Sequence, residues 1–173
     1  MSIILGIDPG SQITGFGVID ASMEKGRDKP RAISHGIIQL KTGSLTFNDR
    51  LLLLSENLDR ILKKYQPDTV VVEKLFLGKN PDSAFKLGHA RGICIAKAME
   101  IRSAVFEYTP REVKKTITGS GSSDKIQVAE VLKFLLGINH FDFLDASDAL
   151  ALAYHHHCVH KANQMISQAK QNE

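Results

Sequence analysis

The first forty positions alternate apolar runs with short polar turns. Residues 3–7 form an uninterrupted apolar run that predicts a buried strand, and residues 13–19, where glycines separate the apolar residues, predict a second strand. The Pro9-Gly10-Ser11 segment between them is a turn sequence, so the two strands are expected to form a hairpin. A polar stretch then leads to a third predicted strand over residues 32–40. This part of the chain therefore predicts an antiparallel meander.

From about residue 45 the pattern changes, and helical segments alternate with strand-like ones. Apolar residues recur at helical spacing over 45–65, and the β-branched stretch at 69–72 predicts a central strand covered on both faces. Further elements are expected along the rest of the chain: a helix over 83–99, a strand over 104–108, a short helical turn from Pro110, a flexible loop at 119–123, a helix over 124–136, and a final helix from Ala146 to about His160. This order indicates an α/β protein with a mixed five-stranded sheet flanked by helices.

Length and composition fit one globular domain. The chain has 173 residues, of which 43% are hydrophobic and 24% are charged, and no apolar run is long enough to span a membrane. We expect a single domain over residues 1–161 and a polar C-terminal tail over 162–173. The first residues lack a basic, cleavable leader pattern and two cysteines make no disulfide framework, so a cytoplasmic protein is predicted. A net charge of +3 permits a polyanionic partner without requiring one.

Four carboxylates stand at positions that together suggest a metal site. Asp8 and Glu73 each end an apolar strand, and Asp145 and Asp148 are three residues apart at the start of the final helix, on one helical face. If they converge, an oxygen-only cluster results, which suits Mg²⁺ or Mn²⁺ rather than zinc. Taken singly, each acid also has an ordinary structural role, as a turn residue, a solvent-facing strand end or a helix cap. Adjacent histidines at 155–157 point in different directions and are not expected to chelate.

Candidate DNA-contacting residues surround these acids. The Leu75-to-Asn80 segment places apolar residues, Phe76 among them, beside Lys79 in a predicted loop, where either DNA bases or the following helix would cover them. Lys114, Lys115 and Lys125 flank the Gly-Ser loop at 119–123, next to a helix start that suits phosphate contact. A solvated basic face is the alternative for these lysines.

Three motifs in the sequence resemble the RuvC family of Holliday junction endonucleases. They are DPGSQITGFGV at 8–18, VVEKLFLGKNPDSAFKLGHARG at 71–92 and FLDASDALALA at 143–153, and the resemblance extends over about residues 3–160. It implies an RNase H-like fold in which Asp8, Glu73, Asp145 and Asp148 are the catalytic acids and metal ligands. It also implies that Phe76 stacks on unpaired bases and that Lys114 and Lys125 are functional.

The resemblance further implies a homodimer that cuts a four-way DNA junction and works with the RuvAB branch-migration motor. Each active site would use two Mg²⁺ ions, which Mn²⁺ can replace. Paired hydrolysis of two strands of like polarity would leave 5′-phosphate and 3′-hydroxyl ends. Two other classes of protein compete with this interpretation. One is a noncatalytic scaffold for branched DNA, and the other is a fragment of an actin-like ATPase, which would need a second domain that this short chain does not provide.

Overall fold

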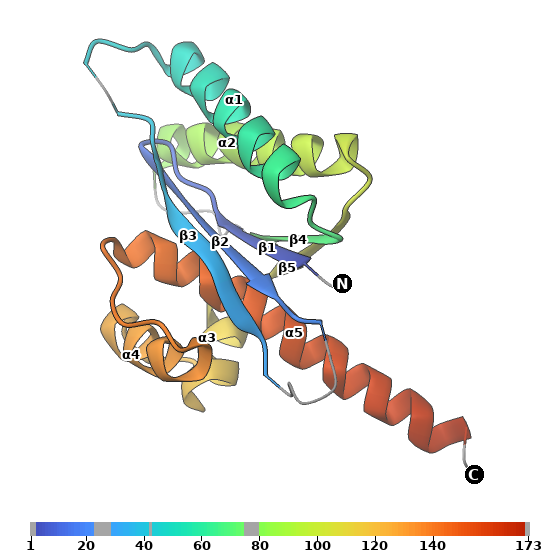
Figure 1. Cartoon of the computed structure of the whole chain (residues 1–173). Helices are drawn as coiled ribbons and strands as arrows, with labels where there is room; N and C mark the ends of the chain where they lie inside the picture. The colour runs from blue at the N-terminus through green and yellow to red at the C-terminus, as the bar shows by residue number, and fades with distance from the viewer. Residues whose placement is uncertain (1–2, 23–28, 42, 75–79, 172–173) are drawn as a thin grey trace.

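A five-stranded mixed sheet forms the centre of the molecule (Figure 1). The computed structural model of the chain describes residues 3–22, 29–41, 43–74 and 80–171. The strand order is β3-β2-β1-β4-β5, with β1 to β3 antiparallel and β1, β4 and β5 parallel. The antiparallel part is the predicted meander. The bounds are Ile3–Asp8 for β1, Ile13–Asp20 for β2, Arg31–Gln39 for β3, Thr69–Glu73 for β4 and Ala104–Tyr108 for β5.

Helices cover both faces of the sheet (Figure 1). On one face lie α1 (Phe47–Tyr65) and α2 (Pro81–Glu100), and on the other lie α3 (Pro110–Thr118), α4 (Lys125–Leu136) and α5 (Leu144–Gln171). Local sequence sets several of these helix starts, because Thr46, Thr109 and Asp124 each begin a helix with a capping box. Within the described residues, no helix is both long enough and apolar enough to cross a membrane.

The apolar core is divided between the two faces of the sheet. Val70, Val71 and Val72 of β4 are completely buried, and Val71 belongs to the cluster on the α3–α5 side while its neighbours belong to the cluster on the α1–α2 side. Because successive strand residues point to opposite faces, a central strand between two helical layers must be apolar at every position. The continuous apolar run in the sequence therefore identified this strand correctly.

Two helices, α3 and α5, extend well beyond their predicted lengths. The expected short turn at Pro110 is a nine-residue helix, and α5 runs to Gln171, so its predicted end near His160 is wrong. The apolar pattern stops there, but the following residues are good helix formers and include no glycine or proline that would end the helix. Residues 162–170 are exposed, as expected for a polar tail, but they are helical rather than frayed. The division of the chain at residue 161 stays a prediction.

Three glycines let α5 lie directly on the sheet. A Cβ atom added at Gly6 would lie 1.9 Å from the carbonyl oxygen of Ala149, and one added at Gly15 would lie 2.1 Å from that of Asp145. At Gly17 an added Cβ would lie 2.6 Å from the Leu150 side chain. Glycine in these strands thus removes the atoms that would hold the helix away. The close approach fixes the first turns of α5 against β1 and β2.

Candidate metal centre

The four acids predicted from the sequence come from three elements that meet at one edge of the sheet. β1 and β4 are parallel neighbours whose last paired residues are Ile7 and Val72, so Asp8 and Glu73 follow at the carboxyl ends of adjacent strands. The first turns of α5 bring Asp145 and Asp148 to the same edge. One carboxylate oxygen each from Asp8, Asp145 and Asp148 lies within 4.8 Å of the others.

Glu73 lies outside that tight group of three but faces the same space. A cleft of about 290 Å³ is lined by Asp8, Glu73 and Asp148 together with Lys114, Lys125 and neighbouring apolar side chains. The acids at the strand ends line it on one side, and its other lining residues come from the first turns of α3 and α4 and from the N-terminal third of α5. The structure therefore brings all four predicted acids to one site, with Glu73 at a somewhat greater distance.

Burial and mutual repulsion raise the pKa values of Asp8, Glu73 and Asp148. Burial, with added repulsion from Glu73, Asp148 and Asp145, raises the pKa of Asp8 to about 8, although Lys125 opposes the rise. The pKa of Glu73 is raised by burial and by Asp148, and burial also raises the pKa of Asp148. A divalent cation would relieve this repulsion, and the donor set consists only of oxygens, as Mg²⁺ and Mn²⁺ prefer. The residues present therefore fit such an ion.

Lys125 is part of the acidic cluster. Its Nζ lies 2.5 Å from a carboxylate oxygen of Asp148 and 3.7 Å from one of Asp145. Burial alone would lower the pKa of Lys125, but the hydrogen bond to Asp148 and the surrounding carboxylates raise it. In the structure Lys125 neutralises part of the acidic charge, and the phosphate contact predicted for it from the sequence stays a prediction. A bound cation would compete with it for the same oxygens.

The other predicted DNA-contacting residues differ in their placement. Lys114 on α3 lines the cleft, whereas Lys115 is exposed and is not among the residues that line it. Phe76 and Lys79 lie outside the described residues.

Thr14 was not predicted from the sequence as a site residue. It is fully buried, and its hydroxyl forms hydrogen bonds with both the amide and the carbonyl of Gly10 at 3.2 Å. These bonds brace the turn that follows Asp8, and a lone threonine after a Pro-Gly turn was the only signal for them.

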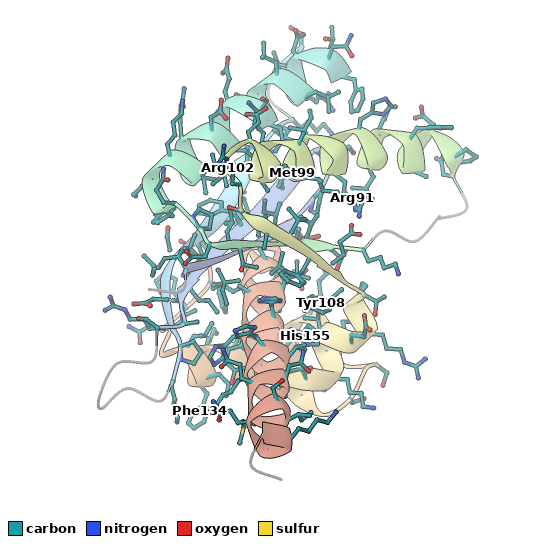
Figure 2. The ribbon with its side chains drawn as sticks, turned by 90° about the vertical axis from the view of Figure 1, so that its right-hand side faces the viewer. Arg91, Met99, Arg102, Tyr108, Phe134 and His155 are labelled. Carbon is teal, nitrogen blue, oxygen red and sulfur yellow. The ribbon has the colours of Figure 1, made fainter. Side chains whose placement is uncertain are left out.

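Two of the histidines of α5, His155 and His156, face inward and contact side chains of the protein. His155 and His156 are each 5% exposed; the Nδ1 of His155 lies 2.7 Å from the hydroxyl of Thr116, and that of His156 lies 2.9 Å from the hydroxyl of Tyr108. Figure 2 shows Tyr108 and His155 close together between β5 and α5. In the part of the chain that the structure describes, the acidic group is the only cluster of three or more side chains placed to hold a metal.

A mixed five-stranded sheet with carboxylates at the ends of its central strands and on a crossing helix places the chain among the RNase H-like proteins. The family model described as "Crossover junction endodeoxyribonuclease RuvC" matches residues 4–156. The chain belongs to the RuvC family.

Individual relatives agree with this membership. The chain is 43% identical to the crossover junction endodeoxyribonuclease RuvC of Bdellovibrio bacteriovorus over 96% of both sequences, and 42% identical to that of Alkalilimnicola ehrlichii over 94% of both. Among solved structures, T. thermophilus RuvC in complex with a Holliday junction substrate superposes with a TM-score of 0.78 at 25% identity, covering 90% of this chain and 92% of that one. The yeast mitochondrial Holliday junction resolvase Ydc2, with a TM-score of 0.64 at 14% identity over 94% of this chain and 84% of its own, shares the fold.

Proposed function

We propose that this protein resolves Holliday junctions by metal-dependent hydrolysis of two DNA strands of like polarity, leaving 5′-phosphate and 3′-hydroxyl ends. The observation that carries the proposal is geometric: carboxylate oxygens of Asp8, Asp145 and Asp148 lie within 4.8 Å of one another, and Glu73 lines the adjoining cleft with Asp8 and Asp148. The raised pKa of Asp8 supports it. These four residues are the proposed metal ligands, and two Mg²⁺ ions, replaceable by Mn²⁺, are the proposed cofactors. Membership of the RuvC family supplies the substrate class.

The residues of the chain have separate tasks in this reaction. Asp8 is more buried than Glu73 and Asp148 and stands at the end of a central strand, so it would hold a metal ion rigidly. The chemistry that divalent ions supply when bound is polarisation of the phosphodiester and activation of a water molecule. Lys125, released from Asp148, and Lys114 at the cleft wall can then contact DNA phosphates. Stacking of Phe76 on unpaired bases and contacts from Lys79 and Lys115 complete the proposed DNA interface.

The outer face of α2 supports a homodimer. Phe85 is 71% exposed, and it borders a hollow of about 580 Å³ lined also by Gly88, His89 and Gly92. A Cβ added at Gly88 or Gly92 would meet no atom of this chain within 4 Å, so the fold itself does not require glycine there. Close approach of a second copy would require it. A two-fold pair would present two identical sites to a junction of matching symmetry.

Two further proposals rest on family membership. Cooperation with the RuvAB branch-migration motor would couple cleavage to movement of the junction. A cytoplasmic location would place the protein with chromosomal DNA. Neither proposal is needed for the chemistry at the cleft.

A cleavage assay tests the proposed function. Labelled four-way junctions and matched linear duplexes are incubated with the protein, with and without Mg²⁺, and we expect symmetric nicks in the junction only when Mg²⁺ is present. Asp145→Asn should bind the junction but not nick it, whereas Asp142→Asn, which alters an exposed carboxylate three residues earlier, should do both. A noncatalytic scaffold would bind the junction equally well in every sample and leave it uncut.

A further inference from the structure

Arg91 connects α2 to the end of the strand that carries Glu73. Its Nε donates a hydrogen bond to the backbone carbonyl oxygen of Glu73 at 3.4 Å, and its guanidinium forms an ion pair with the carboxylate of Glu107 on β5. The Arg91 side chain is 22% exposed, and Figure 2 shows it on the side of α2 that faces the sheet. One guanidinium thus bridges the last residue of β4 and the neighbouring strand.

The end of β4 has few other backbone restraints. Its pairing with β1 stops at Val72, one residue before Glu73, so on that side the sheet does not hold Glu73 itself. On the other side, Glu73 lies opposite Tyr108, and the amide of Lys74 donates to the Tyr108 carbonyl oxygen at 2.9 Å. Arg91 adds a side-chain restraint directly to the Glu73 carbonyl. The rigid, forked guanidinium suits this bridging position better than an ammonium would.

We propose that Arg91 is a positioning residue that holds Glu73 in the orientation required for binding metal. This inference rests on the proposed function of the acidic cleft. Partners that orient a metal ligand without touching the metal commonly contribute strongly to metal affinity. Arg91 has this relation to Glu73, the acid that stands farthest from the tight group of three.

Arg91 acts through the backbone of Glu73. The cations that lower the pKa of the Glu73 carboxyl are Lys125 and Lys114, which belong to α4 and α3 and line the cleft. Loss of Arg91 is therefore expected to change where the carboxylate lies more than how readily it ionises. The expected signature is weaker metal binding with little change in the pH profile of cleavage.

The decisive measurement is Mn²⁺ binding to the free protein, followed by electron paramagnetic resonance in the absence of DNA. Arg91→Gln should raise the Mn²⁺ dissociation constant by about tenfold and raise the half-saturating Mg²⁺ concentration for nicking by a similar factor. Junction affinity measured without metal should stay the same. Arg60→Gln, which removes an exposed arginine from α1 on the same face of the sheet, is the matched control and should leave all three values unchanged.

Glu107→Gln provides a second variant, because it loosens the guanidinium while keeping Arg91 in place. We expect it to weaken Mn²⁺ binding in the same direction but less than Arg91→Gln, and it decides the question if Arg91→Gln fails to fold. Unchanged Mn²⁺ affinity in the folded variants would overturn the positioning role even if their melting temperatures fell. If the wild-type protein itself neither bound Mn²⁺ nor nicked junctions, the proposed function would fail first, and this inference with it.

Discussion

Asp8→Asn provides the sharpest test of the acidic cluster, because the substitution removes one charge and keeps the side-chain shape. In the metal-free protein the pKa of Asp8 is raised from 3.8 to about 8 by burial and by the neighbouring acids. Between those two values the folded state binds more protons than the unfolded state. The contribution of Asp8 to stability is therefore complete below pH 3.8 and is lost as the pH rises toward 8. The asparagine variant has no such loss.

The size of this effect on stability follows from the size of the pKa shift of Asp8. A pH of 7 lies about three units above the pKa of 3.8 that Asp8 has in the unfolded state, and each unit corresponds to about 1.4 kcal/mol. The loss of stability caused by Asp8 therefore has an upper limit of about 4 kcal/mol. Movement of Lys125 and entry of water will relieve part of the repulsion. We therefore expect Asp8→Asn to raise the free energy of unfolding of the metal-free protein by about 1–3 kcal/mol at neutral pH.

Urea unfolding in the presence of a chelator, at pH 5 and pH 8, measures this effect. The wild-type protein should lose more stability between the two pH values than Asp8→Asn does. Adding Mg²⁺ at a hundred times its dissociation constant should stabilise the wild-type protein by about 2.7 kcal/mol and the variant by much less. Asp142→Asn, which removes an exposed carboxylate, should differ from wild type by no more than about 0.5 kcal/mol.

The reasoning would be refuted by an asparagine variant that is no more stable than wild type without metal and gains as much from Mg²⁺. That outcome would mean that the other acids do not repel the Asp8 carboxylate and that Asp8 does not bind the cation with them.

Three more substitutions test other parts of the structure. Gly15→Ala should cost about 1–3 kcal/mol in urea unfolding and reduce nicking, because its Cβ would collide with the backbone oxygen of Asp145. Lys125→Gln should lower the melting temperature of the metal-free protein, because the acids lose their neutralising cation, and Mg²⁺ should restore much of the loss. Burial lowers the pKa of His156 to about 4, so the contribution of His156 to the stability of the wild-type protein should be lost as the pH falls from about 6.5 toward 4. His156→Gln should flatten that part of the stability profile measured by thermal unfolding.

Much of the site could be anticipated because its signals are local. An apolar run ending in an acid marks a strand that delivers a carboxylate to the edge of a sheet, and this applies to both Asp8 and Glu73. Two acids three residues apart at a helix start share a face, which placed Asp145 beside Asp148. The periodicity of apolar residues also predicted the five strands and the order in which helices alternate with them, because it reflects which face of each element is buried.

The tertiary structure decided what these elements do to one another. Pairing of β1 with β4 brings Asp8 next to Glu73 although a hairpin and a long helix separate them in the sequence. The glycines of β1 and β2 let α5 press its backbone onto the sheet, which a glycine pattern alone does not reveal. The position of Lys125 among the acids was not predicted from the sequence, because it depends on how α4 packs beside α5; its contact with DNA phosphates stays a prediction. The sequence determined which side chains are available to form the site, and long-range packing determined the distances between their charges.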